Sequence, residues 1–461
     1  MKFDRYLDCI PDYKAFLTVD ELDASTKRLA RLHPESVRVF TAGHSTNGHP
    51  IYCLKIGDGP KNALAFGCPH PNEPIGAMML ESFASLLAES KELRDALGFT
   101  WYIVKTSDPD GTKLNEGWFK GPFTIYNYAR NYYRPAADHQ VEWTFPIRYK
   151  NLDFQHPIPE TQALMGIIDR IKPQFLYSLH NAGFGGVFWY ISKEDPDIYT
   201  KLPDIARKYG IPLSMGEPEV PYCKLLGPAV YRLIGTRDMY DFYERQTDHP
   251  EKLIPCGTSS NDYANSVGNT LTLVSELPYF YDSRIDDTSE TKTLRRDAVL
   301  KSCDIWDSAI HFVRELYIKI EADVSTTNPF RQALSDFLHI GAAELAAKRN
   351  WAVSAKGLVV PATVSEVFDN LNVSYFYSLL FLSLLVRIPE YEQAHASKTI
   401  GSEAREQLNR VFVQAEKELK KRAVALEREM NYTVVPIKKL ISIQLESGFL
   451  AVSVLNGKDR I

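Results

Sequence analysis

The first two-thirds of the chain alternates between two hydrophobic patterns. Short runs rich in β-branched and aromatic residues, typical of strands, are separated by longer segments with apolar residues every three or four positions, typical of helices. The strand-like runs are VRVFTAG, IYCLKIG, NALAFGC, FTWYIVK, FLYSLHN, GVFWYIS and TLTLVSE. This alternation, up to about residue 320, predicts an α/β fold: a mixed, mostly parallel central sheet with helices on both faces.

Three of these runs are nearly continuous in apolar residues: 63–68, 175–179 and 271–275. Strands covered by helices on both faces have this pattern, so we expect the three at the centre of the sheet. Each is followed or ended by a polar side chain, namely His70, His180 and Glu276. Because ligands bind at the carboxyl ends of such strands, we expect these three side chains at one edge of the sheet.

The last third of the chain has helical patterns throughout. The segment TLRRDAVLKSCDIWDSAIHFVRELYIKI predicts a long amphipathic helix, and STTNPF at 325–330 is typical of a linker. We therefore expect two domains, an α/β domain over residues 1–325 and a helix-rich domain of unknown role over residues 326–461.

The longest C-terminal helix is predicted from about Ser402 to Met430, with apolar residues at intervals of three or four. A helix packed within the chain is the first interpretation, and a helix that pairs two copies in a homodimer is the alternative. The most apolar stretch, YFYSLLFLSLLV at 375–386, is shorter than the roughly 20 residues that a membrane span requires. We expect a buried helix there.

Composition and charge exclude several classes of protein. The 461 residues carry a formal net charge of -5 without a basic cluster, so neither nucleic acid nor a membrane is an expected partner. The six cysteines include no CxxC pair, which argues against a disulfide framework and against a thiolate zinc site. The first fifteen residues carry charges and lack an apolar signal-peptide core, so we expect a cytoplasmic protein.

The most informative segment is LAFGCPHPNEPIG, at 64–76, where His70 and Glu73 lie between a buried strand and a helix. Zinc binds imidazole nitrogen and carboxylate oxygen, and catalytic sites with two histidines and one carboxylate leave the fourth position to water. His180, which ends a second buried strand before a loop of small residues, is the natural third ligand. We therefore expect one Zn²⁺ ion held by His70, Glu73 and His180.

Glu276 ends the third strand and delivers a carboxylate to the same edge of the sheet. Beside a metal, a glutamate can take a proton from water and pass it to a leaving amine. The two histidines and two glutamates thus divide into three ligands and one general base and acid. The alternative for Glu276 is a helix-capping or salt-bridged surface residue.

With these residues in place, the first 320 or so residues resemble the zinc metallocarboxypeptidases, with a carboxypeptidase A-like catalytic domain. The motifs that carry the resemblance are AGHSTNGHPIYCLKIG, HPNE, SDPDGTKLNEGW, PIPETQAL, SLH and PCGTSSNDYANSVGNTLTLVSE. In that family an aspartate precedes the catalytic glutamate by a fixed step, and the step from Asp262 to Glu276 is 14 residues. The resemblance implies the metal and base roles given above, in a member without a pro-segment.

The family also uses arginines to bind the terminal carboxylate of the substrate and to stabilise the oxyanion. Arg130, 50 residues before His180, is the first candidate for the carboxylate, and Arg134 is the second. No arginine stands at the oxyanion position, where Lys120 is the candidate instead.

Two further residues are candidates for binding the substrate. Asn261, one position before Asp262, occupies the family's specificity position, and its neutral amide predicts a polar or acidic side chain on the departing residue. Tyr263 is a candidate for the substrate-contacting hydroxyl, because the family's tyrosine position falls on Ile254 here.

Three functions compete. The first is a zinc carboxypeptidase that hydrolyses the last amide bond of a small peptide or peptide-like metabolite. The second is an N-acyl amino acid amidohydrolase of the aspartoacylase or succinylglutamate desuccinylase type, because HPNEPIG also resembles the metal motif of those enzymes. The third is a non-catalytic binding protein on the same fold.

Overall fold

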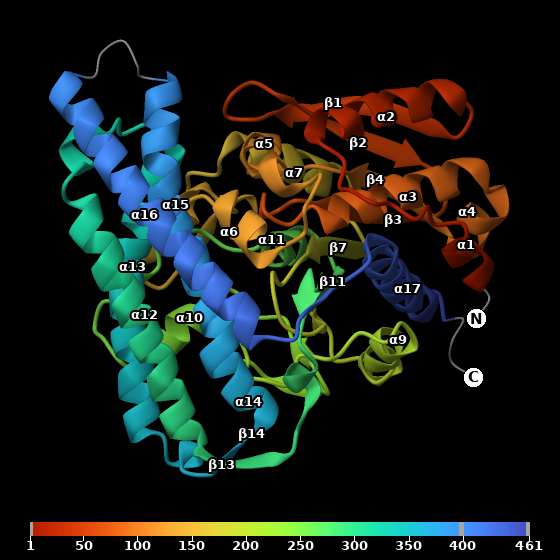
Figure 1. Cartoon of the computed structure of the whole chain (residues 1–461). Coiled ribbons are helices and arrows are strands. Elements are labelled where there is room, and N and C mark those ends of the chain that lie inside the picture. The colour runs from red at the N-terminus through yellow and green to blue at the C-terminus, as the bar shows by residue number, and fades with distance from the viewer. Residues whose placement is uncertain (1–2, 396–400, 458–461) are drawn as a thin grey trace.

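The computed structural model of the chain describes residues 3–395 and 401–457. Its centre is a nine-stranded sheet in the order β1-β2-β4-β3-β7-β11-β8-β10-β9 (Figure 1). The strands are β1 (Val37–His44), β2 (Pro50–Ile56), β3 (Lys61–Gly67), β4 (Phe99–Val104), β7 (Phe175–His180), β8 (Phe188–Ile191), β9 (Leu225–Gly227), β10 (Val230–Arg232) and β11 (Leu271–Glu276). Strands β4, β3, β7 and β11 run parallel at the centre, with antiparallel pairs on either side. The predicted mixed sheet is confirmed.

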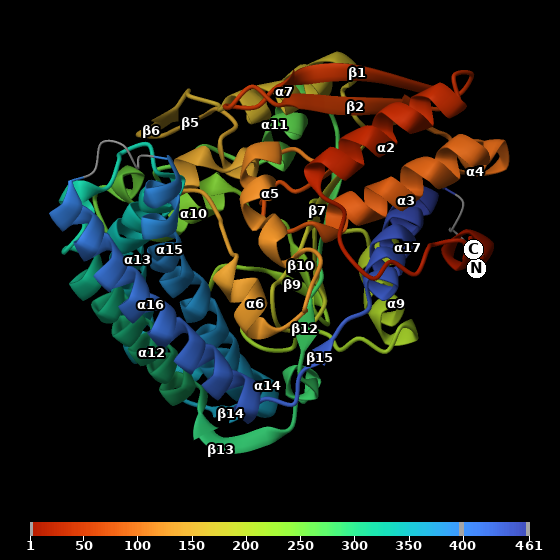
Figure 2. The same cartoon turned by 45° about the horizontal axis from the view of Figure 1, so that its top comes forward.

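Alternate residues of the central strands point to opposite faces of the sheet, and each face is covered by helices. In β3, Ala63 and Ala65 belong to the core that includes α3 (Ile75–Glu89) and α17 (Ile437–Leu455). Leu64 and Phe66 belong instead to the core formed with α7 (Pro159–Ile171). Figure 2 shows α3 and α17 side by side beneath the β1–β2 hairpin. The near-continuous apolar runs reflect this double covering.

A bundle of long helices flanks the sheet. It consists of α12 (Arg295–Tyr317), α13 (Pro329–Ser354), α15 (Ser374–His395) and α16 (Ser402–Glu429). The buried residues of α16, including Leu408 and Leu419, face α15 of the same chain. The packed-helix interpretation of this segment is therefore supported, and its apolar face is not free to pair with a second copy.

One helical stretch among the described residues, Val364–His395, is long and apolar enough to cross a membrane by length and composition. It comprises α14 (Val364–Phe368), a π-helical segment (Asp369–Val373) and α15. In the fold, 72% of its most apolar window is buried inside the molecule. This agrees with the buried helix expected at 375–386.

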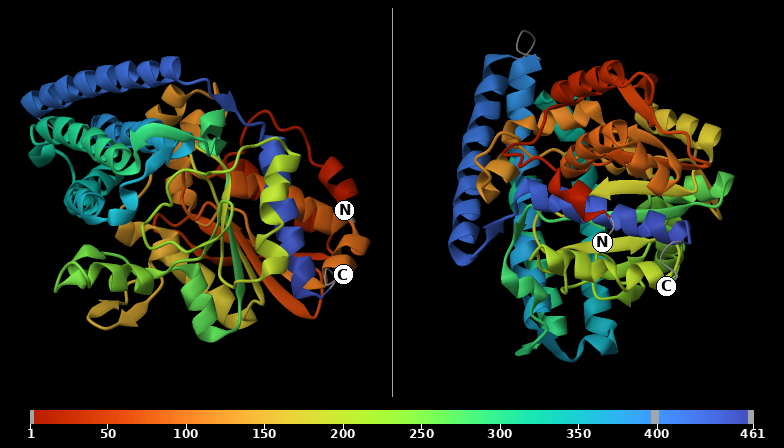
Figure 3. Two further views of the ribbon diagram at one scale, coloured as in Figure 1. Left: turned by 90° about the horizontal axis from the view of Figure 1, so that it is seen from below. Right: turned by 90° about the vertical axis from the view of Figure 1, so that its right-hand side faces the viewer.

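The helices on either side of residue 325, where a domain boundary was expected, do not pack as two separate groups. Helix α12 precedes that residue but packs on α13 and α15, whereas α17 follows it and packs on α3 and β11. Figure 3 shows the bundle at one end of the molecule and α17 apart from it against the sheet. The segment STTNPF is a turn between α12 and α13, in which the buried Asn328 caps α13. The C-terminal residues therefore do not form one separate helical domain.

The remaining elements connect these layers. They are α1 (Asp4–Asp8), α2 (Val19–Leu32), α4 (Lys91–Leu97), α5 (Pro109–Asn115), α6 (Ile125–Arg130), α8 (Pro196–Tyr199), α9 (Leu202–Lys208), α10 (Thr236–Tyr243), α11 (Ser260–Val267), and the strand pairs β5 (Ile147–Tyr149) with β6 (Leu152–Phe154), β12 (Phe280–Tyr281) with β15 (Thr433–Val434), and β13 (Glu290–Leu294) with β14 (Pro361–Thr363).

Candidate metal centre and active site

The turn between β3 and α3 holds the first two candidate ligands. His70 and Glu73 both lie in this turn, which is closed by a hydrogen bond from the Glu73 amide to the His70 carbonyl at 3.1 Å. The turn is held close to the sheet because Gly76 is the second residue of α3. A Cβ atom on Gly76 would lie 2.6 Å from the Cβ of Leu179. The small residue thus lets α3 approach β7, which ends in the next ligand.

His180 and Glu276 end two adjacent parallel strands, and they are paired directly in the register of β7 and β11. The expected meeting of the strand ends at one edge of the sheet is therefore observed. The His180 carbonyl accepts a hydrogen bond from Gln444 of α17, so this helix supports the strand end from below the sheet.

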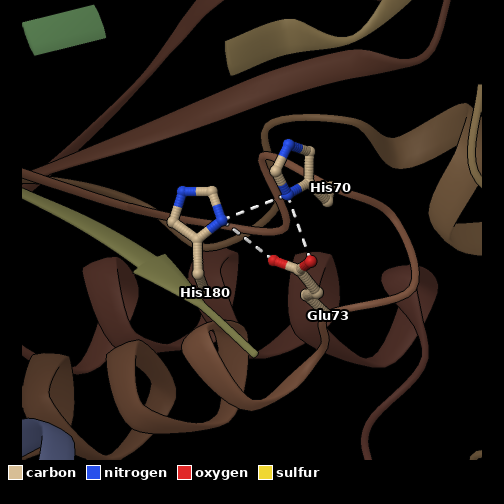
Figure 4. A group of neighbouring side chains, drawn as sticks. All are labelled: His70, Glu73 and His180. Atoms are coloured by element: carbon tan, nitrogen blue, oxygen red, sulfur yellow. Dashed lines mark hydrogen bonds and ion pairs between the residues drawn. The ribbon is translucent and has the colours of Figure 1, made fainter. Parts of the chain in front are cut away.

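The three candidate ligands converge on one point (Figure 4). The Nδ1 atom of His180 lies 3.1 Å from Nδ1 of His70 and 3.0 Å from Oε2 of Glu73. The Nδ1 atom of His70 lies 3.1 Å from Oε1 of Glu73. In a tetrahedral zinc site with bonds near 2.0 Å, neighbouring ligands are separated by roughly 3.3 Å. Two imidazole nitrogens and a carboxylate turned toward each other at this spacing fit a divalent cation.

The protonation states also suit a metal. Burial, together with the positive charge of Arg134, lowers the pKa of His70 to about 3, so its imidazole is neutral. Burial opposes ionisation of Glu73, but the adjacent His70 and His180 rings hold the pKa of that carboxyl well below its usual value. Neutral imidazole and ionised carboxylate are the forms that bind zinc.

Glu276 lies beside this cluster, with its Oε1 atom 3.8 Å from Nδ1 of His180. Burial raises the pKa of Glu276 well above the ordinary value, and the negative charges of Glu73 and Glu219 raise it further. A divalent cation at the cluster would act in the opposite direction. A glutamate whose affinity for a proton depends on its surroundings in this way suits general base and acid chemistry.

Of the two candidate arginines, Arg134 reaches the site and Arg130 does not. The Nη1 atom of Arg134 lies 3.3 Å from Oε1 of Glu73, and the side chain lines the same cavity as the ligands. Arg130 instead forms ion pairs with Glu390 of α15 and Glu416 of α16, the latter at 2.7 Å. Arg130, the first candidate, therefore ties α6 to the helical bundle, and Arg134, the second candidate, is the one that lines the cavity.

The candidate for oxyanion stabilisation, Lys120, and the further candidates for substrate binding, Asn261 and Tyr263, do not line the cavity. Lys120 binds Glu21 at 2.6 Å and the Phe16 carbonyl at 3.0 Å. Tyr263 donates to Asp169, and the Asn261 amide pairs with its neighbour Asp262. The loop before α11 contributes Ser259 to the cavity wall instead. Nothing in their positions supports the roles expected for Lys120, Asn261 and Tyr263.

The cavity above the metal cluster has a volume of about 410 Å³. One wall comes from the sheet and its loops, including Tyr190 and Glu219. Further lining residues come from the helical bundle, including Trp306 and Tyr377, and from the π-helical segment, which contributes Asp369. No sequence motif marks these residues, because only the folded chain brings the bundle to the strand ends. Glu142, another cavity residue, carries no motif that marks it.

A parallel-centred sheet with a His–Glu–His cluster and a glutamate at its strand ends defines an α/β protein with a candidate zinc site and an adjacent carboxylate. The chain belongs to the zinc carboxypeptidase family, since the family model for zinc carboxypeptidase matches residues 22–282, more than half of the 461 residues. This match favours the first of the three functions considered over the aspartoacylase type.

Individual relatives are distant. Carboxypeptidase SOL1 of Arabidopsis thaliana is 23% identical over 206 residues, covering 41% of this chain and 38% of that protein. Carboxypeptidase D of Anas platyrhynchos is 24% identical over 266 residues, covering 53% of this chain and 18% of that protein. The chain thus spans well under half of each. Carboxypeptidase A of Helicoverpa armigera aligns in structure over 58% of this chain and 65% of its own, with 15% identity and a TM-score of 0.37.

Proposed function

We propose that the protein is a zinc-dependent metallocarboxypeptidase that hydrolyses the C-terminal amide bond of a small peptide or peptide-like metabolite. The observation that carries this proposal is the placement of Glu276 against the His70–Glu73–His180 cluster, with Arg134 in the same cavity. One cavity thus contains the proposed base, the three metal ligands and a cation that can bind the substrate carboxylate.

When bound by the three ligands, zinc would polarise the scissile carbonyl and lower the pKa of a water molecule. Glu276 takes the proton of the attacking water and returns it to the nitrogen of the departing residue, so that one water is added across the amide bond. The Arg134 guanidinium binds the terminal carboxylate through charge-assisted hydrogen bonds, which orients the last amide bond toward Glu276.

The dimensions of the cavity support a small substrate. A volume of about 410 Å³ is at the lower end of the range for ligand pockets, roughly 300–1,000 Å³. Side chains of the helical bundle, such as Trp306 and Leu380, bound this space on the side away from the sheet. A long or folded polypeptide would have to displace them.

The test is product analysis by mass spectrometry on a library of short peptides and N-acyl amino acids, with and without a chelator. Release of single C-terminal residues that stops on chelation is the expected result. Cleavage of N-acyl amino acids alone would favour the amidohydrolase, and no turnover of either class would favour the binding protein.

Two variants separate the proposed roles of the residues. Glu276→Gln should retain zinc and lose most turnover, whereas His70→Ala should lose both. A near-normal rate in Glu276→Gln would contradict its assignment as the general base.

A further inference from the structure

A buried chain of hydrogen bonds connects the ligand His180 to Glu142. The Nε2 atom of His180, on the side of the ring away from the metal cluster, lies 2.8 Å from the Ser178 hydroxyl. The Ser178 hydroxyl lies 3.1 Å from Oε2 of Glu142. All three side chains are buried, with at most 6% of any of them exposed. The chain of contacts is therefore shielded from solvent.

The chemistry of the groups fixes the direction of these hydrogen bonds. Because Nδ1 of His180 faces the metal cluster, a metal ligand needs its lone pair there, and the ring proton must lie on Nε2. The Nε2 hydrogen then donates to Ser178, whose own hydroxyl hydrogen donates to Glu142. A neutral serine hydroxyl can serve both partners in this order, because it has one donor and two acceptor sites.

The second carboxylate oxygen of Glu142 is fixed by Ser260. Its Oε1 atom accepts hydrogen bonds from the Ser260 amide at 3.1 Å and from the Ser260 hydroxyl at 2.7 Å. Its position thus depends on the start of α11, not on the metal cluster. Glu142 makes its contact with His180 only through Ser178, which makes the serine a relay.

The second histidine ligand has no such support. The Nε2 atom of His70 is buried and has no hydrogen-bond partner within the described part of the chain. The two imidazole ligands therefore differ in how firmly their rings are oriented. Groups that hydrogen-bond to a metal-binding histidine fix its tautomer and raise its basicity, and their loss commonly costs 10- to 100-fold in metal affinity.

We propose that Ser178 and Glu142 are positioning residues that hold His180 in the tautomer and orientation required to bind zinc. This inference rests on the zinc site alone and does not depend on the substrate proposed above. It assigns to Glu142, which no motif marks, a role in metal binding.

The test measures zinc affinity by chelator competition in the full-length protein. Ser178→Ala removes the relay, and Glu142→Gln keeps the shape of the side chain while removing its charge. We expect the zinc dissociation constant to rise 10- to 100-fold in Ser178→Ala and about 10-fold in Glu142→Gln. Ser447→Ala is the matched control, because Ser447 is a buried serine that accepts a hydrogen bond from Trp189 in the core between α17 and β8.

The double variant distinguishes a relay from general support of the fold. If Glu142 acts through Ser178, adding Glu142→Gln to Ser178→Ala should change zinc affinity by less than twofold, because the connection is already broken. Additive losses, or a dissociation constant in Ser178→Ala within twofold of wild type, would overturn the proposal.

The urea unfolding midpoint of each metal-free variant separates lost affinity from lost folding, and a Ser178→Ala protein that is folded but binds zinc weakly is the expected result. A protein that binds zinc with this pattern but cleaves no peptide would contradict the proposed function and leave this inference standing. If Ser178→Ala does not fold, the isosteric Glu142→Gln variant decides, since unchanged zinc affinity in that folded protein would overturn the relay.

Discussion

Arg134 and Arg130 lie four residues apart and have different surroundings, so they provide a matched pair. Arg134→Gln should lower kcat/KM for peptides by about 10- to 100-fold, mainly through KM, because a charge-assisted hydrogen bond to the substrate carboxylate is lost. Arg130→Gln should leave both constants within twofold and lower the unfolding midpoint, because Glu390 and Glu416 lose their partner. Steady-state kinetics and urea unfolding check both variants, and a larger effect on KM from Arg130 would reverse the assignment.

The buried carboxyl group of Asp108 makes the free energy of unfolding depend on pH. Burial raises the pKa of Asp108 to about 8, although the amide of Gly111 donates to the carboxyl at 2.8 Å. The folded protein therefore keeps this proton between about pH 4 and pH 8 while the unfolded chain loses it, so the free energy of unfolding falls over that range.

Asp108→Asn should retain the cap of α5 and remove this titration. The variant should be close to wild type in stability at pH 4.5. At pH 8 it should be more stable by at least about 1.4 kcal/mol, the value of one pKa unit. Urea unfolding at the two pH values measures the difference, and an equal effect of the substitution at both would show that Asp108 does not titrate as described.

At the scale of elements, the approach of α3 to β7 determines the metal site. Gly76→Ala places a Cβ 2.6 Å from the Leu179 Cβ and 3.0 Å from the Leu179 carbonyl, so α3 must shift. Overpacking of this kind costs about 1–3 kcal/mol, and zinc affinity should fall as well because His180 follows Leu179. Gly166→Ala in α7 is the control: apart from its chain neighbours and the backbone of its own helix, no atom lies within 4 Å of the added Cβ, so the substitution should stabilise the protein by about 1 kcal/mol.

The residues at the strand ends could be predicted from the sequence, because the pattern that marks a buried strand and its end spans only a few neighbouring residues. A buried strand is a short apolar run, and a polar residue directly after it lies at the edge of the sheet whatever the rest of the chain does. His70, His180 and Glu276 were found in this way, and the structure pairs two of them in register.

The positions of the loop side chains could not be predicted from their separation along the sequence. Arg130 has the expected sequence separation from His180, but α6 turns its side chain toward the bundle, and Arg134 reaches the site instead. The loop before α11 likewise presents Ser259 to the cavity and leaves Asn261 outside it. Loop conformation depends on long-range packing, which residue spacing does not encode.

For the molecule as a whole, the amphipathic patterns predicted the helices but not their partners. Helix α16 was expected from Ser402 to Met430 and is observed from Ser402 to Glu429. The same pattern could not show that α12 joins the bundle or that α17 returns to the sheet beside α3. These long-range contacts bring bundle residues such as Trp306, and Asp369 of the π-helical segment, to the cavity beside the metal cluster, so its lining comes from segments far apart in the sequence.

This shared cavity gives a prediction about the charge of the substrate. Beyond the metal cluster its walls carry Glu219, from the loop before β9, and Asp369, from the π-helical segment. The Tyr190 hydroxyl donates to Glu219 at 2.5 Å, and the Glu217 amide donates to Asp369 at 2.9 Å. The polar or acidic preference expected from Asn261 has no support in its position, because that residue does not line the cavity. Burial raises the pKa of Glu219 above its usual value and the pKa of Asp369 to about 7. Above neutral pH, the ionised carboxylates should repel acidic side chains and attract basic ones.

In a panel of short peptides that differ in one side chain, we expect lysine or arginine to be favoured over glutamate. Glu219→Gln should keep its hydrogen bond with Tyr190 and reduce that ratio of kcat/KM values by about tenfold, equivalent to about 1.4 kcal/mol. Glu315→Gln, which makes the same change of charge on the outer surface of α12, should leave the ratio unchanged. A preference for glutamate in the unmodified protein, or an equal shift in both variants, would show that these carboxylates do not select the substrate.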